Sequence, residues 1–404
     1  MNYWWHLRPF DTPAWLNHAV FLLGNALYGA ALSLRAFGSD RLRLAALTAA
    51  LIVLGPQTVL MTGWFNTLIP GIWIAAAFAV LTLPFGLRVC RLLLFLFVPL
   101  TLIAYSTYPL LLLLVCLLHR DAGRNLGEFI KTMAAFAAAF AFGMVVMFGL
   151  NWLIHGVFGL RYVSWRSATP AHNLAGVIAN LPLLRDFLSW TFSGLGFGHA
   201  WLAAANMVAF FIALIVIAQR RPVEALSILT GALAGLLLLS VLSLKDGVYI
   251  FFRSTQFVWA AYAIALARAV VLSGSEPRAR HLAAALVATT AASAVYTAMV
   301  HRVLIPFQQE TRRIAAAIPN GAAEVRIFGS FNDLPEAVAA NIQHDDAIRF
   351  RIWMLTGLPT IACSTEPETC ANPQPPLKLP KPGEPTTVEA RGTIAFIQLP
   401  GPPG

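Results

Sequence analysis

Long apolar segments follow one another from near residue 14 to residue 303, and they limit what this chain can fold into. Several of them reach the roughly 20 residues that a helix needs to cross a bilayer. Their apolar residues do not alternate with polar ones, so a helix bundle is favoured over a β-barrel. The sequence predicts an all-α polytopic membrane bundle of about ten transmembrane helices, near residues 14–35, 43–60, 67–85, 89–104, 107–118, 129–154, 200–218, 223–243, 250–272 and 281–303.

Composition and charge placement agree with this class. Hydrophobic residues make up 58% of the chain and charged residues 11%, which excludes an ordinary soluble domain. The formal charge of +10 could suggest nucleic acid, but the arginines stand in short clusters between the apolar segments. We therefore expect membrane lipids as partners and no nucleic acid. The clusters contain Arg35, Arg41, Arg43, Arg88, Arg91, Arg120, Arg124, Lys131, Arg220, Arg221, Arg268, Arg278 and Arg280.

Loops that carry these clusters alternate with loops that hold few basic residues. The positive-inside rule places the basic loops in the cytoplasm. The amino terminus, the loop at 155–199 and the tail after Arg302 are then expected on the opposite face of the membrane.

Three regions follow from this pattern. Residues 1–13 form an outside segment, residues 14–303 form the transmembrane domain with an amphipathic outside loop at 155–199, and residues 304–404 form a small α/β tail. In the tail we expect helices over 308–318 and 334–342, strands over 324–330 and 392–399, and a loose Pro-rich loop over 364–386. An outside location favours a disulfide between Cys363 and Cys370.

The stretch from Lys245 to Gln256 brings ionisable residues to the edge of the membrane. On a continuous helix, Asp246, Tyr249, Arg253 and Gln256 share one face. Charged groups at membrane depth are costly and usually face a cavity, a partner or a substrate. The alternative is an Asp-Arg pair that snorkels to the surface at a helix end.

Neither a metal nor a nucleotide cofactor is expected. No Cys/His spacing matches a zinc site, and no glycine-rich loop follows a strand and precedes a helix. Any chemistry then depends on side chains alone.

Two junctions between apolar segments carry short motifs. One span ends with Gly55-Pro-Gln-Thr58, and Thr62-Gly-Trp-Phe-Asn66 leads into the next. Two short segments meet at Tyr105-Ser-Thr-Tyr-Pro109, where Pro109 cannot continue the preceding helix and biases Tyr108 away from it. In this order, with the outside loop and tail, the chain resembles the bacterial and phage-borne O-antigen glucosyltransferases that convert serotype.

The resemblance implies a GT-C-like fold in the bacterial inner membrane and a periplasmic active site. Those enzymes take glucose from a polyprenyl-phosphate donor and add it to an envelope glycan. This chain departs from them in two ways. It has Tyr108-Pro109 where the family often has Tyr-Gln. The resemblance also implies that a leading helix and most of the first outside loop, which carries the family's catalytic carboxylates, are absent ahead of Asp11. The resemblance therefore predicts a truncated or misplaced start.

Transfer of a sugar requires a base for the acceptor hydroxyl and cations for the departing phosphate. Asp11 is the base that the resemblance favours, and Asp246 is the alternative. Arg253 is the first choice for the phosphate because a guanidinium pairs with two phosphate oxygens. The remaining substrate-binding candidates are Lys245, Arg161, Arg166, Tyr249, Gln256 and Tyr108.

Other functions fit the same features. A flippase of lipid-linked sugars could use the face at Asp246 and Arg253 as a path, although no inverted repeat is seen. An O-antigen polymerase or ligase is a further alternative, against which the tail argues. A catalytically inactive relative could bind the lipid carrier without transfer.

Overall fold

The computed structural model describes residues 14–61, 65–159, 169–248, 250, 252–273, 275–340, 342, 345–370, 380–381 and 384–400. Among these residues the chain forms two compact units, one over Ala14–Thr297 and the other from Ala298 onward. The predicted outside segment at 1–13 and part of the Pro-rich loop lie outside the described residues.

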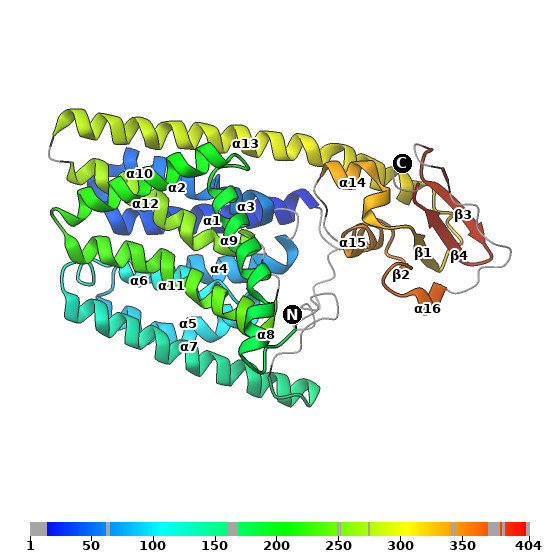
Figure 1. Cartoon of the computed structure of the whole chain (residues 1–404), viewed down its shortest axis with the longest axis horizontal. Helices are drawn as coiled ribbons and strands as arrows, with labels where there is room; N and C mark the ends of the chain where they lie inside the picture. The colour runs from blue at the N-terminus through cyan, green and yellow to red at the C-terminus, as the bar shows by residue number, and fades with distance from the viewer. Residues whose placement is uncertain are drawn as a thin grey trace. The chain divides into compact units, whose positions relative to one another are not determined.

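Helices make up the first unit, and most of them run roughly parallel to one another (Figure 1). The helices α8 and α9 run across the others at one end of the unit. The bounds are α1 Ala14–Phe37, α2 Leu42–Val53, α3 Pro56–Met61, α4 Phe65–Leu81, α5 Leu87–Ala104, α6 Pro109–Leu117, α7 Leu126–His155, α8 Leu174–Ala179, α9 Leu181–Leu195, α10 Ala200–Ala218, α11 Pro222–Asp246, α12 Gln256–Leu272 and α13 Glu276–Ala316, with short 3₁₀ turns η1 Ser39–Arg41 and η4 Phe252–Thr255.

Among the described residues, six helices are long and apolar enough to cross a membrane, namely α1, α5, α7, α10, α11 and α13. The other predicted crossings are shorter. Two correspond to the apolar stretches Leu68–Leu81 and Gln256–Leu272. The segment expected at 43–60 is divided between α2 and α3, and the one at 107–118 is the nine-residue α6. The part of the chain that the structure describes is thus mainly helical, with six candidate spans and a small sheet near its carboxyl end.

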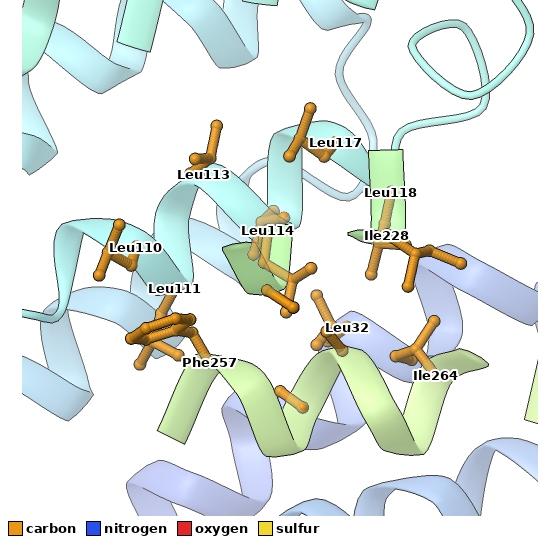
Figure 2. Packing of buried hydrophobic residues seen from close by; sticks show 14 of the residues in the cluster. Leu32, Leu110, Leu111, Leu113, Leu114, Leu117, Leu118, Ile228, Phe257 and Ile264 are labelled. Carbon is orange, nitrogen blue, oxygen red and sulfur yellow. The ribbon is translucent and has the colours of Figure 1, made fainter. Parts of the chain in front are cut away.

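The short helix α6 lies at the centre of the first unit. All of its residues are buried, as expected of a helix that is apolar all round. Figure 2 shows Leu111 of α6 beside Phe257 of α12, while Leu113 and Leu117 point to the other side of the helix. The same buried cluster includes Leu32 of α1, Ile228 of α11 and Ile264 of α12. The Tyr28 hydroxyl of α1 also donates to the Leu111 carbonyl at 3.0 Å, so α6 is held by packing and by a hydrogen bond.

A proline divides α2 from α3. Pro56 has no N–H, so the Ile52 carbonyl loses the helical partner it would have four residues on. The Thr58 hydroxyl binds that carbonyl at 3.4 Å, and the Trp259 indole donates to the neighbouring Leu51 carbonyl at 2.8 Å. A Cβ at Gly55 would lie 2.4 Å from the Trp259 ring, so only glycine admits this tryptophan. Together with the Gly55 amide, which donates to the Ile52 carbonyl at 3.3 Å, these side chains satisfy the carbonyls at the break.

The second unit contains a four-stranded sheet in the order β2-β1-β4-β3. The central strand β1, Glu324–Phe328, is parallel to β2, Thr360–Ala362, and to β4, Ile394–Gln398. The edge strand β3, Thr387–Arg391, is antiparallel to β4. Its core combines the sheet with Phe307 and Ile314 of α13 and with Ile318, which follows that helix. Its other helices are α14 Pro335–Ala339, α15 Asp345–Thr356 and α16 Pro367–Cys370.

The structure joins Cys363 and Cys370 in a disulfide, with their Cα atoms 5.5 Å apart. The pair connects the end of β2 with α16. Two helices and two strands of the second unit match the expected segments. The strands β2 and β3 and the helices α15 and α16 were not predicted, and α16 lies within the segment expected to be a loose loop.

Candidate functional site

The junction between α11 and α12 coincides with the stretch for which the sequence predicts a polar, functional helix face. The helix α11 ends at Asp246, and Gly247 adopts a left-handed conformation with φ 60°. The turn η4 follows, and α12 begins only at Gln256. The prediction of one helical face from Asp246 to Gln256 was therefore wrong. A Cβ at Gly247 would lie 2.2 Å from the Thr169 hydroxyl, so glycine is required here for two reasons.

The last carbonyls of α11 are bound by residues on either side of α8, namely Ala171 before it and Asn180 after it. Asn180 Nδ2 donates to the Leu244 carbonyl at 3.0 Å and to the Thr169 carbonyl at 3.0 Å. The Ala171 amide donates to the Lys245 carbonyl at 2.7 Å. Helix carbonyls at a C-terminus need such partners. These hydrogen bonds fix residues 169–180 against the end of α11.

Beside this junction, polar side chains meet inside the apolar unit. Gln256 is 3% exposed, and its Nε2 donates to Asn25 Oδ1 at 2.6 Å and to the Thr58 hydroxyl at 3.2 Å. Asn25 in turn donates to the Phe21 carbonyl at 2.9 Å. Together with Gln57, which adjoins Thr58 in α3, we call these residues the amide cluster: Asn25, Gln57, Thr58 and Gln256.

Polar atoms in the amide cluster, and one on the helix α9 that packs against α3, have no hydrogen-bond partner among the described residues. Both amide atoms of the fully buried Gln57 belong to this group, as does Gln256 Oε1. The buried Thr191 hydroxyl of α9 also belongs to it. The helix α3 packs against η4, α9 and α12. The elements that carry these polar atoms are therefore in contact through α3. Buried polar groups are normally satisfied, so each of these atoms requires an explanation.

The junction between α5 and α6 also reaches this region. The Tyr105 hydroxyl lies 3.3 Å from the Ser254 hydroxyl of η4, and the rings of Tyr105 and Tyr108 are 5.1 Å apart. Tyr108 is 1% exposed and packs over Gly71, where a Cβ would lie 2.2 Å from its ring. Its backbone is helical, with φ −69° and ψ −23°. The expectation that Pro109 moves Tyr108 out of the helical region was wrong, because Tyr108 caps α6 in a turn.

The described candidates at this junction belong to three elements. Lys245 is exposed and Asp246 half-buried at the end of α11. Arg253 belongs to η4, and Gln256 belongs to the amide cluster. Four candidates lie outside the described residues, namely Asp11, Tyr249, Arg161 and Arg166.

Sequence reasoning missed Asn25, Gln57 and Thr191 as site residues. A signal existed for Gln57, because Gln57 and Thr58 are polar neighbours within an otherwise apolar segment. Asn25 offered the same signal in the first span. Their association with Gln256 depends on long-range packing that no local pattern contains.

The opposite end of the first unit carries charges in pairs. Arg268 of α12 binds Glu224 of α11 and donates to the Ala36 carbonyl of α1 at 3.3 Å. Arg91 of α5 binds Glu128 of α7, and Arg35 donates to the Thr82 hydroxyl at 2.9 Å. These arginines come from the clusters that the sequence assigns to the cytoplasm. Each connects two or more chain segments, as structural charges do.

Among the described residues, no group of three His, Cys, Asp or Glu side chains could hold a metal ion. Comparison of the chain with protein-family models, with curated proteins and with solved structures finds no match in any of the three. The resemblance to the O-antigen glucosyltransferases thus depends on the order of short motifs alone.

Proposed function

We propose that this protein is a membrane glycosyltransferase. It takes glucose or a related hexose from a polyprenyl-phosphate donor and transfers it to O-antigen or another cell-envelope glycan. The observation that supports this proposal is the amide cluster, which lies inside an apolar helical unit beside the α11–α12 junction. Polar groups at membrane depth are costly and are commonly part of a functional site.

The chemistry assigns different tasks to neutral and charged groups. Amides and hydroxyls bind sugar hydroxyls, since each can donate or accept. Arg253 and Lys245 stabilise the phosphate as the bond from the sugar carbon to the phosphate oxygen breaks. Asp246 takes the proton from the acceptor hydroxyl, whose oxygen forms the new bond to that carbon. The donor carries its sugar already activated, so no nucleotide enters the reaction.

The proposal includes an orientation in the bacterial inner membrane. The paired arginines mark the cytoplasmic end. The α8–α9 segment and the second unit are then periplasmic. The Cys363–Cys370 disulfide supports this assignment, because disulfides form and persist in oxidising compartments.

A transfer assay tests the proposed function. The purified protein in nanodiscs is given polyprenyl-phosphate-glucose and a cell-envelope glycan acceptor, and glucosylated product is measured. Arg253→Ala should lower the rate at least tenfold, because the leaving phosphate loses its main cation. Arg185→Ala is the control, since Arg185 is exposed on α9 and pairs only with the neighbouring Asp186 among the described residues. Equal rates for the wild type and Arg253→Ala would remove Arg253 from the mechanism.

A flippase of lipid-linked sugars is the second candidate, and the interrupted helices favour it. The break between α2 and α3 and the turn between α11 and α12 resemble the discontinuous helices that bind substrates in transporters. Proteoliposomes that contain the lipid donor but no acceptor separate the two. Movement of the donor between leaflets without product formation would favour the flippase.

A further inference from the structure

Gln57 carries the strongest unexplained feature of the first unit. Its side chain is completely buried, and neither its Nε2 nor its Oε1 has a partner among the described residues. Leaving a buried donor and acceptor unpaired carries the full desolvation cost of both. A residue with this cost is expected to bind something that the described residues do not supply.

Two further atoms have the same property and come from neighbouring elements. Gln256 Oε1 stands at the start of α12, and the Thr191 hydroxyl stands on α9. The helix α3, which carries Gln57, packs against both α9 and α12, and α9 packs against η4. The hydrogen bond from Gln256 to Thr58 fixes α12 against α3 at this point. The unpaired atoms are therefore held by one packed set of elements.

The hydrogen-bonding capacity of these atoms restricts the chemical class of ligand that can bind them. A metal cation satisfies only acceptors, so it leaves the Gln57 Nε2 donor unpaired. An ionised sugar requires an opposite charge when buried, and the amide cluster consists of neutral side chains. A hydroxyl group both donates and accepts, and so it matches the amide of Gln57 and the hydroxyl of Thr191.

We propose that Gln57, Gln256 and Thr191 bind the ring hydroxyls of an uncharged hexose and discriminate against sugars that carry a charge. This inference rests on the proposed function for the presence of a lipid-linked sugar. It adds the side chains that recognise the sugar and the class of sugar that they accept.

Binding measurements on the full chain in nanodiscs test the inference. Three probes are titrated, namely polyprenyl phosphate, polyprenyl-phosphate-glucose and polyprenyl-phosphate-glucuronate. We expect the wild type to bind the glucose lipid at least tenfold more tightly than the glucuronate lipid. Gln57→Met, which keeps the side-chain volume, should weaken binding of the glucose lipid about tenfold and leave polyprenyl phosphate unchanged. Thr191→Val should act in the same direction with a smaller effect.

The matched control is Ser227→Ala. Ser227 lies near the start of α11 and also has a buried hydroxyl without a partner among the described residues. It is not part of the amide cluster, so Ser227→Ala should leave the affinity for all three lipids unchanged.

The possible failures are distinct. If Gln57→Met binds the glucose lipid as the wild type does, or the glucuronate lipid binds equally well, the sugar site is wrong, while transfer of glucose would still support the proposed function. If the wild type binds none of the three lipids, the proposed function fails together with the sugar site. Discrimination without transfer would keep the sugar site and overturn the transferase.

Discussion

The two ends of the first unit hold different kinds of polar side chain, although buried atoms without a partner among the described residues occur at both, Arg35 Nε and the Ser227 hydroxyl among them. At one end, Arg268 pairs with Glu224 and Arg91 pairs with Glu128, and each pair joins different helices. At the end near α8 and α9, Gln57 and Gln256 are neutral and leave polar atoms unpaired among the described residues. Paired buried charges hold helices together. Buried neutral groups without hydrogen bonds carry a desolvation cost, which a bound ligand or water molecule can offset. We therefore regard the end with the arginine pairs as structural and the end near α8 and α9 as the binding end.

Breaking a pair at the charged end should have the largest effect on stability. Glu224→Gln leaves the Arg268 guanidinium, which is 13% exposed, without a compensating charge. We expect a loss of about 3 kcal/mol in the free energy of unfolding, measured by denaturation in detergent. Glu276→Gln is the control, because the Arg280–Glu276 pair is exposed and should change stability by less than about 0.5 kcal/mol. Equal effects of the two substitutions would show that the buried pair is not structural.

Overpacking at the helix break should have a smaller effect. Gly55→Ala places a methyl group 2.4 Å from the Trp259 ring, and we expect a loss of about 2 kcal/mol. A Cβ at Gly149 of α7 would meet nothing within 4 Å, so Gly149→Ala should instead stabilise the helix by about 0.5 kcal/mol. The free energy of unfolding is measured for both variants, and it should change in opposite directions relative to the wild type. A stable Gly55→Ala variant would contradict the close fit of α3 against α12.

The smallest expected effect is on the pH dependence of the stability of the second unit. The Arg391 guanidinium donates to the Glu389 carboxylate at 2.8 Å, and this hydrogen bond holds the pKa of Glu389 below its ordinary value of 4.5. A carboxyl whose pKa is lower in the folded state adds stability above pH 4.5 and loses it as the pH falls. Glu389→Gln should therefore flatten the acid limb of a melting-temperature profile slightly. An unchanged acid limb would mean that the pair has no effect in solution.

Much of the helical pattern was readable from the sequence, because apolar runs are local. The expected span at 200–218 coincides with α10, and the one at 223–243 lies within α11. The helix breaks were harder to predict. Gly247 ends α11 as a left-handed C-cap before the predicted polar face can form.

The candidate site was predicted only in part. Gln256 was chosen for its place on a helical face, but its partner Asn25 lies 231 positions away in the chain. No local period contains such a contact. In the second unit, β2 is three residues long and exists through its pairing with β1, which explains why the sequence did not indicate it.

Thermal melting of Gln57→Met, with and without polyprenyl-phosphate-glucose, tests the separation of the two ends most directly. Without ligand, the variant should melt at or above the wild-type temperature, because removal of an unpaired buried amide relieves about 1 kcal/mol. With ligand, it should lose most of the rise in melting temperature that the wild type gains from binding. A variant that melts lower without ligand and keeps the full rise with it would contradict the account, since Gln57 would then be structural.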